Sequence, residues 1–469
     1  ISARKVFEMI VDLAWRNGEP GIVFLDRINA ENPTPHVGEV ESTNPCGEQP
    51  LLPYESCNLG SINLSKMVRE EGGAARIDFD KLGRTVHDAV RFLDDVIDVN
   101  RYPLNSIREM TLGNRKIGLG VMGFADMLVR MEIPYDSDEA LEVAEEVMGF
   151  VQREARAASA ELAVQRGTFP NFKGSVFDTG DGPKMRNATV TTIAPTGTLS
   201  IIASCSSGVE PLFAVAFIRN VMDNDELVEV NPLFEEIARR EGFYSDELMK
   251  KIAREGTVHG LEEVPEKWRR IFATAHDITP EWHVRVQAAF QKYTDNAVSK
   301  TVNFPNSASR EEVEQVYRLA YRLGCKGVTI YRDGSRDEQV LNIGAVNRAA
   351  AGAGAEAGAE EDAGDKSLLA PRARPSITVG QTRKMTTGCG NLYVTINEDE
   401  HGPFEVFTQM GKAGGCSASQ SEAIARLISL SLRAGIDPKE IIKQLRGIRC
   451  PNPGWEKGCL LYTSDAADE

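Results

Sequence analysis

A short polar segment near the start of the chain places a thiol between an amide and a carboxylate. It reads Asn44-Pro45-Cys46-Gly47-Glu48, and we expect an extended loop because Asn-Pro and Cys-Gly both disfavour a helix. In extended backbone, Asn44, Cys46 and Glu48 would project on one side, within reach of a single substrate. That would be a catalytic arrangement. The alternative is a turn in which a small cysteine is buried between two polar residues.

A second segment, 191–200, runs from a β-branched stretch through Pro195-Thr196-Gly197-Thr198 into an apolar stretch. This order predicts a strand, a tight turn and a helix. Backbone N–H groups at such a junction can bind phosphate. A plain connection between a strand and a helix fits the same pattern, so both interpretations stay open at this point.

Residues 118–123 match G-x-G-x-x-G, a pattern associated with dinucleotide binding. That function requires an apolar strand directly before the glycines, whereas residues 106–116 are polar and mixed. We expect the glycines to allow close packing of a helix against a strand instead. The chain contains no Cys-x-x-Cys pair, so it lacks a local zinc signature, and we assign no residue as a metal ligand.

The elements that must hold these segments alternate between helices and strands. Residues 136–166 predict a helix, with Asp136 as its cap and Gly167 at its end. The β-branched runs 188–193 and 326–331 predict strands. Helices that alternate with short strands are typical of the α/β fold class.

A change of composition divides the chain. Residues 349–365 consist only of alanine, glycine and acidic residues, which predicts a flexible linker. Beyond it, residues 391–396 predict a strand and residues 421–434 a helix. The sequence therefore predicts a large unit, a linker and a smaller unit.

The overall charge excludes some functions. The 469 residues include 53 Lys and Arg against 69 Asp and Glu, a formal net charge of −16. We expect no binding of polymeric nucleic acid or of an anionic membrane, because both require a basic excess. We also expect a cytoplasmic protein without a signal peptide or membrane helix. In that compartment the eight cysteines are expected to be reduced. Among the residues without a site role, Cys205 is interpreted as a core thiol and His283 as a structural histidine.

The stretch 49–64, which contains Cys57, identifies a family. Together with the first segment it closely resembles the finger loop of ribonucleotide reductases, in the form found in the adenosylcobalamin-dependent class. The resemblance implies that Cys46 becomes a thiyl radical, which abstracts the ribose 3′ hydrogen. It implies that Glu48 assists proton transfer and that Asn44 orients the substrate. Cys57 would be one member of the reducing pair, with its partner upstream of this chain.

The resemblance extends over nearly the whole chain. Pro195, Thr196, Gly197 and Thr198 resemble the loop that holds the nucleotide diphosphate. The implied fold is the later part of the ten-stranded α/β barrel of ribonucleotide reductases and glycyl-radical enzymes, followed by a small α+β domain. We expect boundaries at 1–343 for the barrel, 344–376 for the linker and 377–458 for the small domain. Residues 459–469 depart from the family and are expected to be an atypical tail or artefact.

The same resemblance implies the reaction and its partners. Ribonucleoside diphosphates would be reduced to 2′-deoxyribonucleoside diphosphates with adenosylcobalamin as cofactor and a thioredoxin- or glutaredoxin-like protein as reductant. The chain begins with Ile1 inside an amphipathic pattern, so we expect a missing N-terminal part that binds dNTP or ATP effectors. This fragment alone would then be inactive. A homodimer is left open.

Two other functions remain as alternatives. The large subunit of a metal-dependent, two-subunit reductase would share the finger loop, but that class carries two adjacent tyrosines where this chain has Ile330-Tyr331. A non-catalytic nucleotide-binding relative is the other alternative, and a nicotinamide-dependent dehydrogenase is the least favoured. In the small unit, Cys389, Cys416 and Cys450 could bind zinc, relay electrons or do neither.

Overall fold

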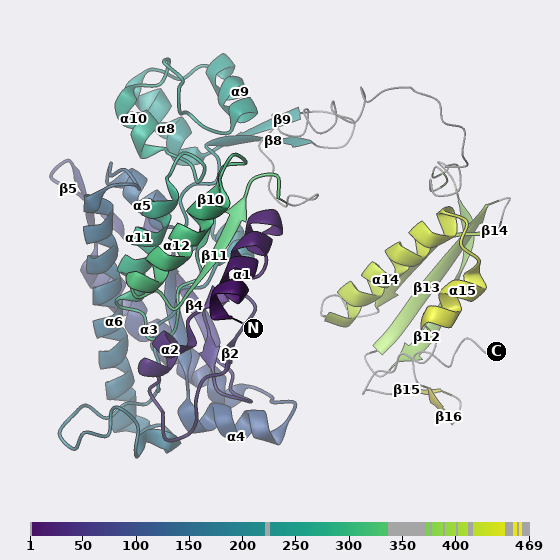
Figure 1. The fold of residues 1–469 in the computed structure, drawn as a ribbon, viewed down its shortest axis with the longest axis horizontal. Coiled ribbons are helices and arrows are strands. Elements are labelled where there is room, and N and C mark those ends of the chain that lie inside the picture. The colour runs from purple at the N-terminus through teal and green to yellow at the C-terminus, as the bar shows by residue number, and fades with distance from the viewer. Residues whose placement is uncertain are drawn as a thin grey trace. The chain divides into compact units, whose positions relative to one another are not determined.

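The computed structural model describes residues 2–220, 226–335, 372, 374, 378–387, 390–399, 402–410, 416–445, 454–456 and 459–461. The chain divides into two compact units, residues 1–357 and 358–469 (Figure 1). The boundaries at 343, 376 and 458 stay predictions. Each unit is described by itself.

The first unit is built around parallel strands. β4 (Asn58–Asn63) pairs in parallel with β7 (Ile117–Met122). The opposite edge of β7 bonds to residues 189–192, and Ile193 of the same segment bridges to Val298, just before β10 (Thr301–Phe304). β10 is parallel to β11 (Gly327–Arg332), and β1 (Ile22–Val23) lies antiparallel along the outer edge of β11.

These pairings form a wall of parallel segments that does not close into a barrel within the described residues. The β-branched run 188–193 joins the wall through single bridges, and the run 326–331 forms β11 as predicted. Parallel strands with helical connections confirm the α/β class.

Helices cover this wall. Their bounds are α1 (Ala3–Asn17), α2 (Leu25–Ala30), α3 (Phe79–Val99), α4 (Asn105–Asn114), α5 (Phe124–Arg130), α6 (Asp138–Arg166), α7 (Gly197–Ala203), α8 (Pro232–Glu241), α9 (Asp246–Glu255), α10 (Glu266–Ile271), α11 (Pro280–Gln291) and α12 (Arg310–Arg322). α6 packs against both α3 and α11, and α11 packs against α12 (Figure 1).

Short antiparallel pairs complete the unit: β2 (Ser42–Thr43) with β3 (Pro50–Leu51), β5 (Val68–Glu71) with β6 (Ala74–Ile77), and β8 (Ala216–Asn220) with β9 (Glu226–Val230).

The predicted helix at 136–166 is confirmed, but its cap is not the expected residue. α6 begins at Asp138, and the Ser137 side chain accepts a hydrogen bond from the Ala140 amide. Ser137 rather than Asp136 therefore satisfies the free N–H group of the first turn. Gly167 ends the helix with a φ of 83°, a conformation that favours glycine.

The second unit is a small α+β domain, as predicted. β12 (Val379–Thr387), β13 (Gly390–Asp399) and β14 (Gly402–Met410) form an antiparallel sheet. α14 (Cys416–Arg433) packs against β14, where the Ser429 hydroxyl accepts from the Val406 amide at 2.8 Å. α15 (Pro438–Leu445) follows, and β15 (Gly454–Glu456) pairs with β16 (Cys459–Leu461).

Two residues within the predicted linker range form ion pairs with this domain. Arg372 forms an ion pair with Asp399 at 2.5 Å, and Arg374 forms one with Glu405 at 2.8 Å. The alanine- and glycine-rich part of the predicted linker lies outside the described residues, as do residues 462–469 of the predicted tail.

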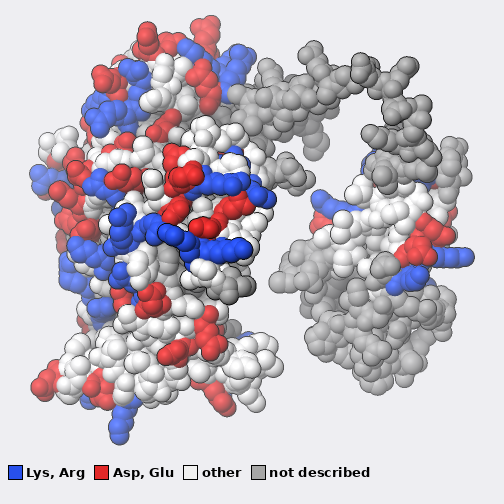
Figure 2. All heavy atoms as spheres, in the orientation of Figure 1, with Lys and Arg blue, Asp and Glu red and all other residues white. Residues whose placement is uncertain are grey.

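Charged side chains of both signs are interspersed over the face of the first unit that is shown in Figure 2. None of the described helices combines the length and the apolar character that crossing a bilayer requires.

Candidate active site

The segment that carries Cys46 is the tip of a β-hairpin. β2 and β3 pair with Thr43 opposite Pro50, and two hydrogen bonds between Asn44 and Gln49 close the loop: Asn44 N–H donates to the Gln49 carbonyl at 3.2 Å, and Gln49 N–H donates to Asn44 Oδ1 at 3.0 Å. Gly47 takes a φ of 80°. The expected extended run is therefore wrong, because the Asn44 side chain bonds to the backbone of its own loop and bends it.

Cys46 is exposed at this tip, whereas Glu48 is only 2% exposed. Partial burial of the thiol raises the pKa of Cys46, and the charge of Glu48 raises it further. A thiol with a raised pKa keeps its S–H bond at neutral pH. The hairpin thus presents a protonated thiol rather than a thiolate.

Glu48 is fixed through its backbone while part of its side chain has no partner. Its carbonyl accepts from Thr192 Oγ1 at 2.9 Å and from Ala297 N–H at 3.0 Å. Its Oε2 is buried without a hydrogen-bond partner among the described residues. A buried carboxylate oxygen with unused acceptor capacity is suited to accept or hold a proton of a bound molecule.

Cys57 lies directly before β4, close enough to sense the same carboxylate. Burial raises the pKa of Cys57 most strongly; Lys116 lowers it, and Glu55 and Glu48 raise it. Because Glu48 raises the pKa of both Cys46 and Cys57, the structure brings these three side chains into one electrostatic environment.

The loop 195–198 starts from the strand segment that holds Glu48. Thr196 has a φ of 53° and precedes α7; its Oγ1 accepts from Gly208 N–H at 2.7 Å. Pro195 is half-buried, whereas Gly197 and Thr198 are exposed. Thr192 contacts the Glu48 carbonyl. The hairpin of residues 42–51, called the finger hairpin below, and this loop are therefore attached to the same strand segment.

The G-x-G-x-x-G glycines have a packing role that differs from the predicted one. They begin inside β7, which is buried along its whole length. A Cβ at Gly118 would lie 2.7 Å from Gln49 Nε2, and one at Gly120 would lie 2.2 Å from the Thr192 carbonyl oxygen. The first two glycines therefore admit the hairpin and the next strand segment rather than a helix, and the pattern is no dinucleotide loop.

Three residues of this site were not found from the sequence. Gln49 is 3% exposed, and both polar atoms of its side chain lack a partner among the described residues. Lys116 Nζ and Glu55 Oε2 form an ion pair of 2.7 Å beside Cys57. The sequence signal was slight: a lysine directly before an apolar stretch and a glutamate two residues before a cysteine.

His283 is a structural histidine, as expected. It is fully buried, with Nε2 at 3.1 Å from the Ala275 carbonyl and Nδ1 at 2.9 Å from Lys300 Nζ. Burial and the Lys300 charge hold the pKa of His283 well below its usual value. Lys300 also donates to Glu210 Oε2 at 2.6 Å, which anchors the segment that follows α7.

The remaining cysteines contribute no described site. Cys205 is half-buried, not a core thiol, and burial raises its pKa to about 11. Cys389 and Cys450, and the side chain of Cys416, lie outside the described residues, so the predicted alternatives for them stay predictions.

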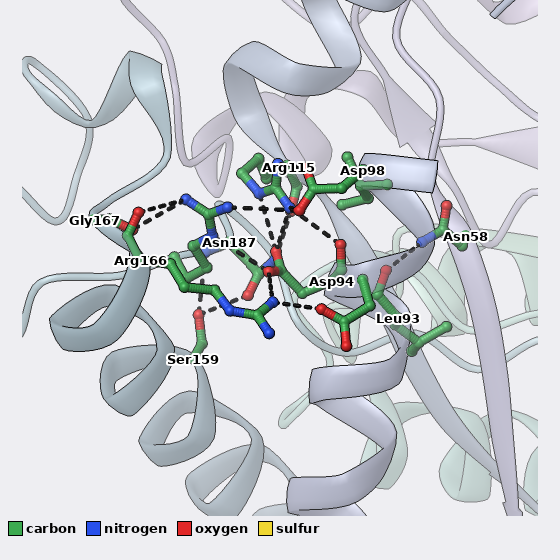
Figure 3. Close-up of polar contacts among 12 residues, drawn as sticks. Asn58, Leu93, Asp94, Asp98, Arg115, Ser159, Arg166, Gly167 and Asn187 are labelled. Carbon is green, nitrogen blue, oxygen red and sulfur yellow. Dashed lines mark hydrogen bonds and ion pairs between the residues drawn. The ribbon is translucent and has the colours of Figure 1, made fainter. Parts of the chain in front are cut away.

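A second buried charge cluster lies at the start of β7. The Asp94 carboxylate is fully buried and accepts from Arg115, Arg166, Arg186 and Asn187 at 2.9 to 3.2 Å. Figure 3 shows Arg115, Asn187 and Arg166 of α6 pointing toward Asp94 of α3. Both carboxylate oxygens have partners, so this cluster is a closed structural network.

Comparisons with known proteins agree with this architecture. Residues 1–331 match the family described as "Ribonucleotide reductase, barrel domain", and residues 366–466 match the TSCPD domain. The chain is 56% identical over 344 residues to a "Vitamin B12-dependent ribonucleoside-diphosphate reductase" of Thermoplasma acidophilum, covering 73% of this chain and 44% of the relative. It is 50% identical over 343 residues to the Mycobacterium tuberculosis protein of the same name, covering 73% and 49%.

A solved structure is also similar. The class Id ribonucleotide reductase alpha subunit of Actinobacillus ureae matches with a TM-score of 0.60 and 26% identity, covering 71% of this chain and 61% of that one. The chain spans about half the length of the curated relatives named above. The finger hairpin, the parallel wall and these matches lead to one conclusion: the chain belongs to the ribonucleotide reductase barrel family.

Proposed function

We propose that this chain carries the radical-bearing part of the active site of a vitamin B12-dependent ribonucleotide reductase, which converts ribonucleoside diphosphates to 2′-deoxyribonucleoside diphosphates. One observation carries the proposal: an exposed protonated thiol, a buried carboxylate and a second thiol share one environment at the finger hairpin. The printed names of the relatives support the substrate class and the vitamin.

The role of Cys46 follows from its S–H bond. Its raised pKa preserves the hydrogen atom that must be lost to form a thiyl radical, and a thiyl radical can exchange hydrogen reversibly with an activated ribose C–H. Glu48 holds or returns the proton of the 3′ hydroxyl through the oxygen that has no protein partner. Cys57 supplies reducing equivalents together with a second cysteine and ends as a disulfide.

The substrate's position follows from the shared strand. Gly197 and Thr198 present exposed backbone for the diphosphate, while the hydrogen bond from Gly208 to Thr196 sets the turn. The ribose would then lie toward Cys46 and Glu48. Asn44 acts chiefly by shaping the hairpin, since its side-chain oxygen already accepts from Gln49.

The residues present fit adenosylcobalamin. The cofactor would supply the initiating carbon radical when bound. Cys46 is exposed and keeps its S–H bond, as the acceptor of that radical must. Ile201 and Ile202 of α7, the helix that follows the loop 195–198, are 78% and 76% exposed, and they offer apolar surface against which a corrin ring could pack.

The metal-dependent two-subunit class is the second candidate. The similarity to the class Id alpha subunit favours it. Against it, Ile330 is 2% exposed and packed in the core, where that class would require a second tyrosine beside Tyr331. A radical made locally therefore fits this chain better than one received through paired tyrosines.

The deciding experiment uses the full-length protein that carries this sequence. Formation of deoxyribonucleoside diphosphate is measured with adenosylcobalamin and a dithiol, in the wild type and in Cys46→Ser. We expect cofactor-dependent turnover that Cys46→Ser abolishes. Turnover that persists in the variant would exclude Cys46 as the radical residue. Turnover that requires a partner subunit instead of the cofactor would favour the second candidate.

A further inference from the structure

The buried ion pair between Lys116 and Glu55 has no role in the chemistry described above. Lys116 is 1% exposed and Glu55 is 8% exposed. The Glu55 carboxylate is well satisfied, since it also accepts from Leu52 N–H at 2.8 Å and from Asn114 Nδ2 at 2.6 Å. Lys116 has three N–H donors, and its one hydrogen-bond acceptor among the described residues is Glu55 Oε2. Its charge therefore has capacity for another partner.

The register of two neighbouring strands places Lys116 beside Cys57. β4 and β7 are parallel, with Asn58 opposite Ile117. Cys57 directly precedes Asn58 and Lys116 directly precedes Ile117, so both residues lie at the same end of two neighbouring strands. Adjacent strands are about 4.8 Å apart, so the two residues are direct neighbours across the pair, and the Lys116 charge acts on the Cys57 thiol.

The charges that surround Cys57 are unbalanced without this lysine. Glu55 in the preceding loop and Glu48 on the hairpin both disfavour a thiolate, as does burial. Lys116 on β7 acts in the opposite direction. A thiolate at Cys57 thus depends on the Lys116 charge.

We propose that Lys116 stabilises the Cys57 thiolate when the disulfide formed during turnover is reduced again, an inference that rests on the reductase function proposed above. A thiolate of the dithiol reductant attacks the sulfur of the cysteine bonded to Cys57. A new S–S bond forms there, the bond to Cys57 breaks, and its electron pair leaves on Cys57 Sγ.

The exchange then completes with all atoms and electrons accounted for. The second thiol of the reductant attacks the mixed disulfide, which releases the reductant as a disulfide and the other cysteine as a thiolate. Each protein sulfur takes up one of the two protons that the dithiol gives up. Cys57 is the leaving group because the neighbouring Lys116 charge favours its thiolate, and a stabilised thiolate leaves faster. Glu55 is a positioning residue that holds Lys116 charged and in place.

The test measures Cys57 directly in the full-length, fully reduced protein. Iodoacetamide labelling of Cys57 is followed by peptide mass spectrometry at pH 8 in the wild type, Lys116→Met, Glu55→Gln and the double variant. Cys205, on a different segment, is the internal reference. A change of one pKa unit alters the thiolate fraction about tenfold. We expect labelling to fall about tenfold in Lys116→Met and to rise severalfold in Glu55→Gln. In the double variant we expect a smaller fall, because loss of the Glu55 charge partly offsets loss of the Lys116 charge.

The direction of the change in Cys57 labelling distinguishes a charge effect from loosened packing. If the ion pair were only structural, all three changes would open the site and raise Cys57 labelling. The double variant leaves no unpaired buried charge, so it keeps the test valid if Lys116→Met folds poorly. Faster or unchanged labelling in the double variant would overturn the proposal.

A second measurement connects the charge to the redox step. We expect reduction of the oxidised enzyme by dithiothreitol to slow in the double variant by a factor similar to the labelling change. An unchanged reduction rate would overturn the role in re-reduction. Labelling needs no nucleotide or cofactor, so it reports on Lys116 separately from turnover. Absence of deoxynucleotide formation by the wild type would refute the reductase function, and with it the redox role, even if the labelling changed as expected.

Discussion

The two buried charge clusters at the start of β7 are organised in opposite ways. Around Asp94, each carboxylate oxygen has partners, and Arg115 also bonds to Asp98 at 2.7 Å (Figure 3). At the finger hairpin, Glu48 Oε2 and both polar atoms of the Gln49 side chain have no partner among the described residues.

The two clusters meet at neighbouring residues. Arg115 belongs to the Asp94 cluster, and the next residue, Lys116, pairs with Glu55 on the hairpin side. Buried polar groups are normally satisfied, because an unpaired one is destabilising. A saturated network beside an unsaturated one indicates a division of work. The Asp94 cluster fixes the strand, and the hairpin side keeps hydrogen-bonding capacity for a molecule that binds.

The strongest test of this division removes the charge at the centre of the closed network. Asp94→Asn leaves Arg115, Arg166 and Arg186 facing an amide, and breaking a buried ion pair costs about 3–5 kcal/mol. We expect that loss in the free energy of unfolding, measured by urea denaturation with circular dichroism. Asp88→Asn, an exposed carboxylate on the same helix, is the matched control, with an expected change within about 0.5 kcal/mol. A loss below about 1 kcal/mol for Asp94→Asn would mean that this network does not fix the strand.

The next test compares two buried glutamines. Gln49→Leu removes polar atoms that have no partner among the described residues, so we expect the free energy of unfolding to stay the same or to rise by up to about 1 kcal/mol. Gln291 donates to the Thr294 and Asn296 carbonyls, each at 3.2 Å. Gln291→Leu should therefore cost about 1–3 kcal/mol, because these carbonyls lose their donor. If both variants lost the same stability in urea denaturation, Gln49 would be a structural residue.

The sequence was sufficient for what depends on local pattern. The α6 helix, its end at Gly167, the strand β11 and the α+β nature of the second unit follow from periodicity and glycine placement, and the structure confirms them. The residues of the finger hairpin were recognised by their order along the chain. Their function as a group stays a proposal.

What the sequence did not provide depends on contacts between distant segments. The parallel register of β4 and β7 brings Cys57 beside Lys116, although many residues separate them, and no local pattern reports such a pairing. The expected extended loop failed for a different reason: Asn44 can bond either to a substrate or to its own backbone, and the hairpin pairing of β2 with β3 favours the second.

The smallest expected effect concerns the pKa of Cys46. Because the Glu48 charge raises this pKa, Glu48→Gln should lower it, and a larger thiolate fraction should speed iodoacetamide labelling of Cys46 by a few-fold below pH 8. The difference should vanish at high pH, where Cys46 is a thiolate in both proteins. The measurement is the labelling rate of the Cys46 peptide from pH 6.5 to 10, with the buried Cys325, whose pKa burial raises to about 12, as a slow reference. A rate that did not depend on Glu48 would mean that the Glu48 side chain does not influence the Cys46 thiol in the free protein. In that case the carboxylate on the hairpin side would not influence the thiol it is proposed to work with, and the contrast with the saturated Asp94 network would rest on hydrogen bonding alone.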